Sequence, residues 1–245
     1  MEAETSTLTV MLLNNLGVLC MESGGFEIAR SLFAKAVTLF KSILDYRQGG
    51  LTQSSLAQRI IYVPDFEIIY LALSNERFGF GSKGGNCECE VQERYPLYVF
   101  GRPIYFSESV MNWKNLPFSK ISVALLFNLG LSYHAIALQD NIICHPFVAD
   151  AIFYYQLAIE VQIKDRIELS ALHTMGIINN ISQLLSVKGD AGKAEESFAL
   201  LLKPLMIYVD QVKLSGGRGL HQELDGFVGN VIQVLLKATL GSAAA

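Results

Sequence analysis

The chain has 245 residues, of which 51% are hydrophobic and 17% charged, and its net charge is −4. This composition excludes a disordered chain, because there is enough apolar material to form a core and too little charge to keep the chain open. Lys and Arg never cluster beyond a pair, which excludes the basic surface that nucleic acids require.

The first predicted element is a pair of helices over residues 8–45. Small and apolar side chains recur at helical spacing on both sides of Gly24, which predicts two amphipathic helices around a glycine turn. The first stripe consists of Leu13, Leu16, Gly17 and Cys20, and the second of Ala29, Phe33 and Ala36. Helices that approach closely need a missing side chain where their backbones meet, so we expect Phe33 to fill the space beside Gly17.

The next element is an insert over residues 49–117. Its runs at 59–63 and 95–106 are rich in β-branched and aromatic residues, and Gly101 interrupts the second run. This pattern predicts an insert that is irregular or contains a β-hairpin.

Two further helical pairs follow, over residues 119–165 and 170–210. The small residue of the first pair returns as Gly130 in the second pair and as Ser182 in the third. A long turn separates the helices of the second pair, and Pro146 suits the first position of the helix after that turn. A terminal helix over 222–240 is expected to cap the helical stack.

This alternation of large and small residues resembles the tetratricopeptide repeat, a helical hairpin of about 34 residues. The small residues of that repeat fall on Gly17, Ala29 and Ala36. The resemblance covers residues 8–45 and 119–210. It implies an all-α fold of antiparallel helical hairpins in a short right-handed superhelix, which forms a single helical-repeat domain over residues 1–245.

Three motifs carry a closer likeness. They are FNLGLSYH at 127–134, GRPI at 101–104 and LDGFVGN at 224–230. Together they resemble a group of uncharacterised diatom proteins with tetratricopeptide-like helices. This likeness implies the helical fold and no particular activity.

Asparagine recurs at one position of the three helical pairs. Asn15, Asn128 and Asn180 each precede the pair of an apolar and a small residue, although asparagine is a mediocre helix former. They lie on the helical face opposite the packing stripe, which lines the concave groove in tetratricopeptide proteins. The groove residues predicted to bind a partner are Asn14, Asn15, Val18, Phe127, Asn128, Leu131, His134, Asn179, Asn180 and Gln183.

An amide side chain both donates and accepts, so these residues are suited to the main chain of an extended peptide. Kinesin light chains, to which this run is similar, use groove asparagines in a related way. None of the predicted groove residues is Lys or Arg, so capture of a C-terminal carboxylate is not expected. Three alternatives stay open: the amides join neighbouring helices, they bond a loop carbonyl, or the insert over 49–117 folds back over the groove.

These observations predict a non-catalytic scaffold that binds a protein or peptide partner. The alternative function is a fixed subunit of a larger complex that buries apolar surface against its neighbours. No catalytic residue is predicted, because the four histidines show no spacing that pairs them with a nucleophile or with each other.

A zinc-binding or cofactor-binding protein is the remaining alternative. Residues 79–84 match the GxGxxG dinucleotide motif, and Cys87 and Cys89 lie just after it, with Cys144 and His145 elsewhere. No apolar helix is expected after the third glycine, and one residue between two cysteines is not the usual chelating spacing. We therefore predict neither a cofactor nor a metal.

The sequence also bears on location. Glu2 and Glu4 stand where a secretory signal carries positive charge, and four cysteines are too few for a disulfide framework. Polar residues interrupt every apolar run before it reaches the ~18 residues that a membrane span needs. We expect an intracellular, cytoplasmic protein without a transmembrane segment.

Overall fold

The structure is a computed structural model, and it describes residues 2–47, 49, 99–107, 116–139, 146–166, 171–215 and 224–232. Internal contacts divide the chain into two compact units. Unit 1 comprises Met1–Phe80 and Arg102–Ile167, and unit 2 comprises Gly81–Gly101 and Glu168–Ala245. The single domain expected over residues 1–245 stays a prediction.

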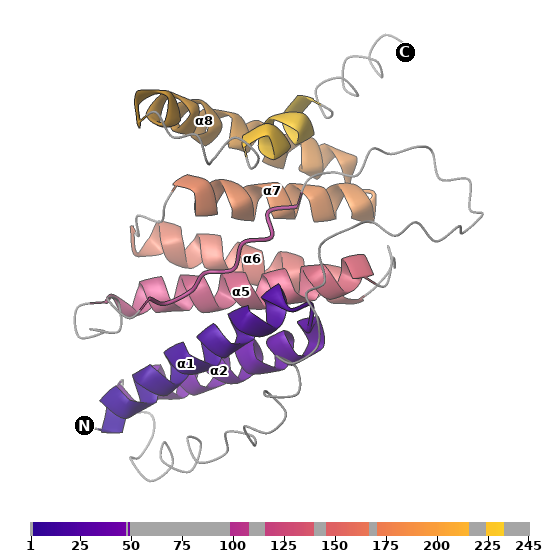
Figure 1. The fold of residues 1–245 in the computed structure, drawn as a ribbon. Coiled ribbons are helices and arrows are strands. Elements are labelled where there is room, and N and C mark those ends of the chain that lie inside the picture. Colours follow the sequence, from indigo (N-terminus) through magenta and orange to yellow (C-terminus); the bar gives the residue numbers. More distant parts are fainter. Residues whose placement is uncertain are drawn as a thin grey trace. The chain divides into compact units, whose positions relative to one another are not determined.

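All regular secondary structure in the described ranges is helical (Figure 1), which confirms the all-α prediction. Unit 1 contains α1 (Glu2–Glu22), α2 (Phe26–Arg47), α5 (Phe118–Gln139) and α6 (Pro146–Lys164). Unit 2 contains α7 (Ala171–Lys188), α8 (Ala191–Ser215) and a helix over 224–232. The part of the predicted cap over 222–240 that is described is therefore helical.

The α1–α2 hairpin closes at a glycine turn. Gly24 has a φ of 80°, a conformation that favours glycine, and the Gly25 N–H donates to the Cys20 carbonyl at 2.8 Å. Further along α1, a Cβ atom at Gly17 would lie 2.5 Å from Cε1 of Phe33. The absent side chain at Gly17 thus lets the Phe33 ring lie against the α1 backbone, as the sequence predicts.

The second hairpin of unit 1 repeats this arrangement with α5 and α6. A Cβ atom at Gly130 would lie 3.0 Å from the ring of Tyr155, which is fully buried. The hairpin packs on the first one through α2 and α5, where the Phe40 and Phe118 rings meet edge to face at 5.6 Å. α6 begins at Pro146, as expected, because proline lacks only an N–H that the first helical turn leaves unpaired.

α5 is long and apolar enough to cross a membrane by length and composition, and it is the one helix of this kind in the described part of the chain. Most of its residues are buried within the structure, including its central Asn128. The prediction that no apolar stretch reaches a spanning length was too strict, because a helix tolerates isolated polar residues. The burial of α5 matches the core helix of a folded domain.

In unit 2, α7 and α8 form the third hairpin. The chain turns at Gly189, whose φ is 88°, and the Asp190 N–H donates to the Leu185 carbonyl at 3.0 Å. Ser182 stands where the other hairpins have glycine, and its hydroxyl donates to the Ile178 carbonyl within α7 at 2.7 Å. Pro204 lies inside α8 and cannot donate a hydrogen bond to the preceding turn.

Residues 99–107 of the predicted insert form an extended segment without an assigned strand or turn. The β-hairpin expected around Gly101 is therefore not confirmed. The rest of that hairpin lies outside the described residues, as do the glycine-rich motif at 79–84, the cysteines at 87, 89 and 144, and His145.

Candidate functional site

Asparagine side chains in both units hydrogen-bond to the main chain of residues 99–107, which we call the resident segment. In unit 1, the side-chain amide of Asn128 hydrogen-bonds to both the N–H and the C=O of Ile104. The Ile104 N–H donates to Oδ1 of Asn128 at 2.7 Å, and Nδ2 of Asn128 donates to the Ile104 carbonyl at 2.8 Å. One amide therefore satisfies both polar groups of one main-chain residue.

Asn15 makes the same pair of hydrogen bonds with Phe106. The Phe106 N–H donates to Oδ1 of Asn15 at 2.9 Å, and Nδ2 donates to the Phe106 carbonyl at 2.8 Å. Asn15 lies on α1 and Asn128 on α5, so one stretch of the resident segment joins two helices that are far apart in sequence. Phe106 is itself buried, whereas its neighbour Tyr105 is exposed.

The extended backbone explains this spacing. In extended chains the N–H and C=O groups of one residue point to the same edge, and the residue two positions later shares that edge. Ile104 and Phe106 therefore present their main chains to the asparagines together. Pro103 is compatible with this arrangement because its missing N–H belongs to the other edge.

Asn14 orients the amides beside it. Its Nδ2 donates to the Ile104 carbonyl at 2.9 Å, and its Oδ1 accepts a hydrogen bond from Nδ2 of Asn128 at 2.8 Å. Both amide hydrogens of Asn128 are thus in use, and only one assignment of its oxygen and nitrogen satisfies all partners. The three asparagines give unit 1 five hydrogen bonds to the resident segment.

Unit 2 holds Phe100 by the same chemistry. The Phe100 N–H donates to Oδ1 of Asn180 at 2.9 Å, and Nδ2 of Asn180 donates to the Phe100 carbonyl at 3.0 Å. The Phe100 ring is fully buried against Gly176, where an added Cβ atom would overlap Cδ1 of the ring. The rings of His173 and Phe227 each lie 5.8 Å from it between centroids. We call Asn180, Gly176, His173 and Phe227 the anchor seat.

The helix over 224–232 supports the anchor seat through two residues one turn apart. Phe227 contacts the Phe100 ring, and Nδ2 of Asn230 donates to Oδ1 of Asn179 at 2.7 Å. Nδ2 of Asn179 in turn lies 3.3 Å from Oδ1 of Asn180. This chain of amides fixes the orientation of Asn180, as Asn14 fixes that of Asn128.

All ten residues predicted to line a groove are buried, between 0% and 5% exposed. The five asparagines form the network with the resident segment. Phe127 and His134 face Tyr155 of α6, with Nδ1 of His134 3.4 Å from the Tyr155 hydroxyl. Val18 and Leu131 belong to the core, and no hydrogen-bond partner of the Gln183 amide oxygen is found in the described structure.

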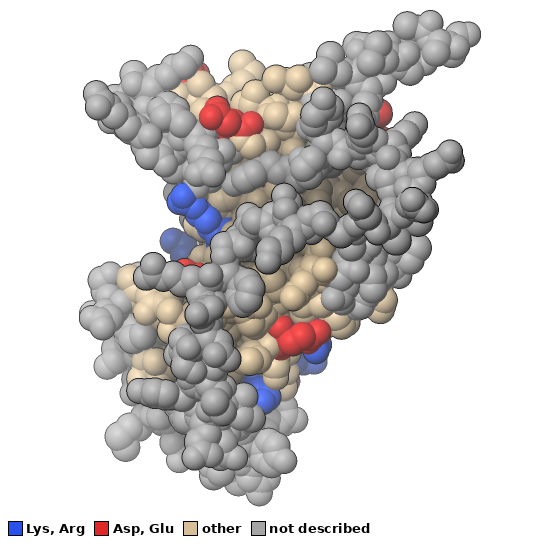
Figure 2. Space-filling view, turned by 45° about the vertical axis from the view of Figure 1, so that its right-hand side comes forward, with Lys and Arg blue, Asp and Glu red and all other residues tan. Residues whose placement is uncertain are grey.

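Within the described ranges, none of the residues that form the hydrogen bonds given above carries a charged side chain. The described surface that faces the viewer in Figure 2 carries separate acidic and basic side chains and no large patch of either sign. Within the described ranges, no group of three or more His, Cys, Asp and Glu side chains could hold a metal ion. Cys20 is buried, and this burial raises the pKa of its thiol, which disfavours the reactive thiolate.

Several residues of the site were not identified from the sequence. The resident segment was interpreted as a hairpin, because alternating aromatic and β-branched residues suit a strand equally well when the partner is a row of amides. Asn230 and Phe227 carry a weak signal, since they lie three positions apart and share a helical face. Gly176 carries a stronger one, because it stands one turn before Asn180 where the other helices have Met11 and Ala124.

Comparison with known proteins gives no relative: no family model, no curated protein and no solved structure matches this chain.

Proposed function

We propose that this protein is a non-catalytic scaffold that binds an extended segment of a partner protein through its asparagines. In this proposal the helical hairpins form a tetratricopeptide-like, short right-handed superhelix, and the protein acts in the cytoplasm. The resident segment occupies the asparagines in the structure and stands in for the partner.

The observation that carries the proposal is the paired hydrogen bonding of three asparagines. Asn15, Asn128 and Asn180 each bond the N–H and the C=O of a single residue. Such contacts recognise an extended main chain whatever its side chains are. Each contributes about 0.5–1.5 kcal/mol net, so several in a row are needed for useful affinity.

The uncharged network also indicates the class of partner. A bound C-terminal carboxylate needs charge-assisted donors, and among the described residues the hydrogen bonds given above join the asparagines to other asparagines and to main-chain groups. The partner is therefore an internal segment of a protein, and nucleic acid is not a ligand. The proposal includes that the partner takes the place of the resident segment on the asparagines when it binds.

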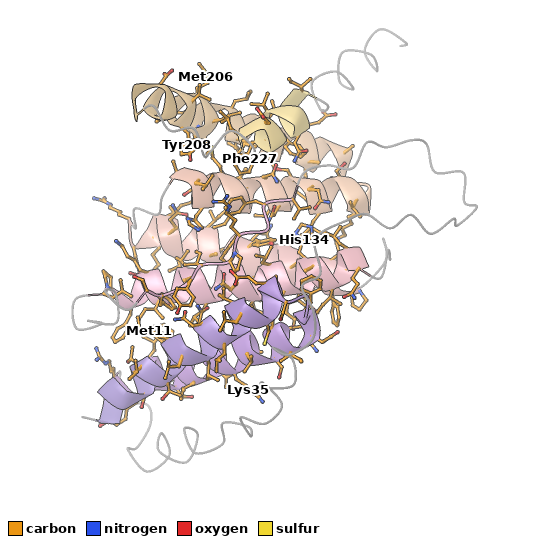
Figure 3. The ribbon with its side chains drawn as sticks, in the orientation of Figure 1. Met11, Lys35, His134, Met206, Tyr208 and Phe227 are labelled. Atoms are coloured by element: carbon orange, nitrogen blue, oxygen red, sulfur yellow. The ribbon has the colours of Figure 1, made fainter. Side chains whose placement is uncertain are left out.

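A second candidate function is a fixed subunit of a larger complex. Large apolar side chains are exposed on α8, with Leu200 67%, Met206 68% and Ile207 49% exposed. Met206 projects from the opposite side of α8 to Tyr208, which is buried (Figure 3). Such a stripe suits a permanent interface, where apolar surface is covered by a neighbour.

One experiment separates the two functions. The full chain is used as bait in cells of its own species, and captured proteins are quantified by mass spectrometry. One variant carries Asn15→Ala, Asn128→Ala and Asn180→Ala, and a second carries Leu200→Ser and Met206→Ser. Circular dichroism and thermal unfolding of each purified bait show whether it is folded.

The scaffold proposal expects a partner that the wild type and the α8 variant capture and the asparagine variant loses. The reverse result supports the fixed subunit. A partner that both variants retain would exclude both surfaces. Because the asparagine variant also loses bonds to the resident segment, its loss of the partner supports the scaffold only if its circular dichroism and thermal unfolding match those of the wild type.

A further inference from the structure

The anchor seat of unit 2 differs from the asparagine contacts of unit 1 in that it also accepts a side chain. The Phe100 ring is fully buried there, next to the backbone of Gly176 and the rings of His173 and Phe227. A buried aromatic side chain in a closely fitting site is the usual anchor of a binding interface. Main-chain and side-chain recognition therefore coincide at one residue.

Gly176 is the residue that makes this possible. Counting one turn back from each recurrent asparagine gives Met11 on α1, Ala124 on α5 and Gly176 on α7. Met11 and Ala124 are buried side chains, whereas at 176 an added Cβ atom would overlap the Phe100 ring. Of the three positions, this one has no side chain, and an aromatic ring fills the space.

The described asparagines give two hydrogen bonds to Phe100 in unit 2 and five to Ile104 and Phe106 in unit 1. Gly101 and Arg102, which follow Phe100, are exposed.

From these observations we propose that the anchor seat binds a phenylalanine in an extended segment of another protein, that Phe100 occupies this seat until it is displaced, and that Gly176 selects the phenylalanine. This inference rests on the proposed function and names the class of its partner. The tether gives the resident segment an effective concentration in the millimolar range, so a partner at lower concentration binds the wild type poorly.

The test uses purified full-length protein and a fluorescent synthetic peptide with the sequence of residues 97–102, LYVFGR, which omits the residues that unit 1 holds. Phe100→Ala empties the seat, and this variant is the reference. Two further variants add Gly176→Ala, which fills the seat, or Gly192→Ala, a control at a glycine of α8 with no atom within 4 Å of its added Cβ. Fluorescence anisotropy measures the affinity of each.

The expected result is that Phe100→Ala binds the peptide at least ten-fold more tightly than the wild type. Adding Gly176→Ala should reduce this affinity at least ten-fold, and adding Gly192→Ala should leave it unchanged. The same peptide with alanine in place of phenylalanine should not bind. Gly176→Ala is tested without the Phe100 ring so that the variant folds, and equal thermal stability of the two Phe100→Ala variants checks this.

A fourth variant, Phe100→Ala with Asn180→Ala, separates this inference from the proposed function. If adding Asn180→Ala lowers the affinity for the peptide and adding Gly176→Ala does not, the phenylalanine seat is wrong and main-chain recognition stands. If neither substitution changes the affinity, the proposed function fails at this site as well. No binding to Phe100→Ala overturns the inference, as does a wild-type dimer that Phe100→Ala dissociates, because the seat then belongs to a second copy of the chain.

Discussion

Two glycines in the helices of this protein matter because they lack a side chain. Gly17 allows the Phe33 ring to approach α1, and Gly176 allows the Phe100 ring to approach α7. Both glycines lie inside helices, where alanine is intrinsically preferred by about 1 kcal/mol. Their helical positions are therefore explained by packing and not by backbone conformation.

Replacing Gly17 with alanine should destabilise unit 1. The added Cβ atom would lie 2.5 Å from the Phe33 ring, and such overpacking costs typically about 1–3 kcal/mol, which outweighs the gain in helix propensity. Urea unfolding followed by circular dichroism measures the change. Gly192→Ala is the matched control, with no atom within 4 Å, and should leave stability equal or higher. Equal effects of the two substitutions would contradict the packing explanation.

The sequence predicts the chemistry of the asparagines better than their surroundings. Their recurrence at Asn15, Asn128 and Asn180 is visible without a structure, and the structure pairs each with a main chain. Their occupation by part of the insert over 49–117 was one of the alternatives that the sequence left open. The residues that bind could not be predicted, because they follow a different pattern and lie 24 to 91 residues from the asparagines in the sequence. His134 was predicted to lie on the groove face of its helix, and in the structure its ring faces Tyr155 of α6.

Among the elements, the helices follow from local signals and the resident segment does not. The paired helices begin and end near glycines with positive φ at Gly24 and Gly189, which the sequence marks directly. The segment at 99–107 has strand-like composition, and its hydrogen-bond partners are side chains on helices, which no strand pattern reveals. Composition thus predicted its extended conformation but not its partner.

Recognition of the resident segment through its main chain has a testable consequence. Ile104→Pro removes the N–H that donates to Oδ1 of Asn128. Oδ1 then lacks this donor, and an unsatisfied buried polar group costs about 1–3 kcal/mol. Tyr105→Pro is the matched control, because the exposed Tyr105 lies between two bonded residues and its N–H belongs to the other edge. We expect thermal unfolding to show a clear loss for the first variant and a small one for the second.

The opposite order, with Tyr105→Pro the more destabilising, would mean that the side chain of residue 105 or its backbone angle matters more than the asparagine pairing. Ile104→Ala completes the series. It keeps the N–H and removes part of a half-buried side chain, so its cost should reflect packing alone.

For the whole molecule, the resident segment is a stretch of chain that belongs partly to each of the two units. Its residues up to Gly101 belong to unit 2, and those from Arg102 onward belong to unit 1. Each part is bound within its own unit, by Asn180 on one side and by Asn14, Asn15 and Asn128 on the other.

Two matched substitutions should therefore act on different units. Truncating a buried phenylalanine costs roughly 3–5 kcal/mol. Hydrogen exchange measured by mass spectrometry should accelerate in α7 and in the helix over 224–232 for Phe100→Ala, and in α1 and α5 for Phe106→Ala. Acceleration of all helices by either variant would show that the chain unfolds as one cooperative unit.

The long sequence separations within the network also set the order of folding during synthesis. Phe106 follows Asn15 by 91 residues, and Asn180 follows Phe100 by 80 residues. Each contact therefore forms only when a long loop closes. When α1 and α2 leave the ribosome, the main chain that their asparagines bind has not yet been made. Asn14 and Asn15 can bind the resident segment only once residues 104–106 have been made, and Asn128 joins them later, with α5.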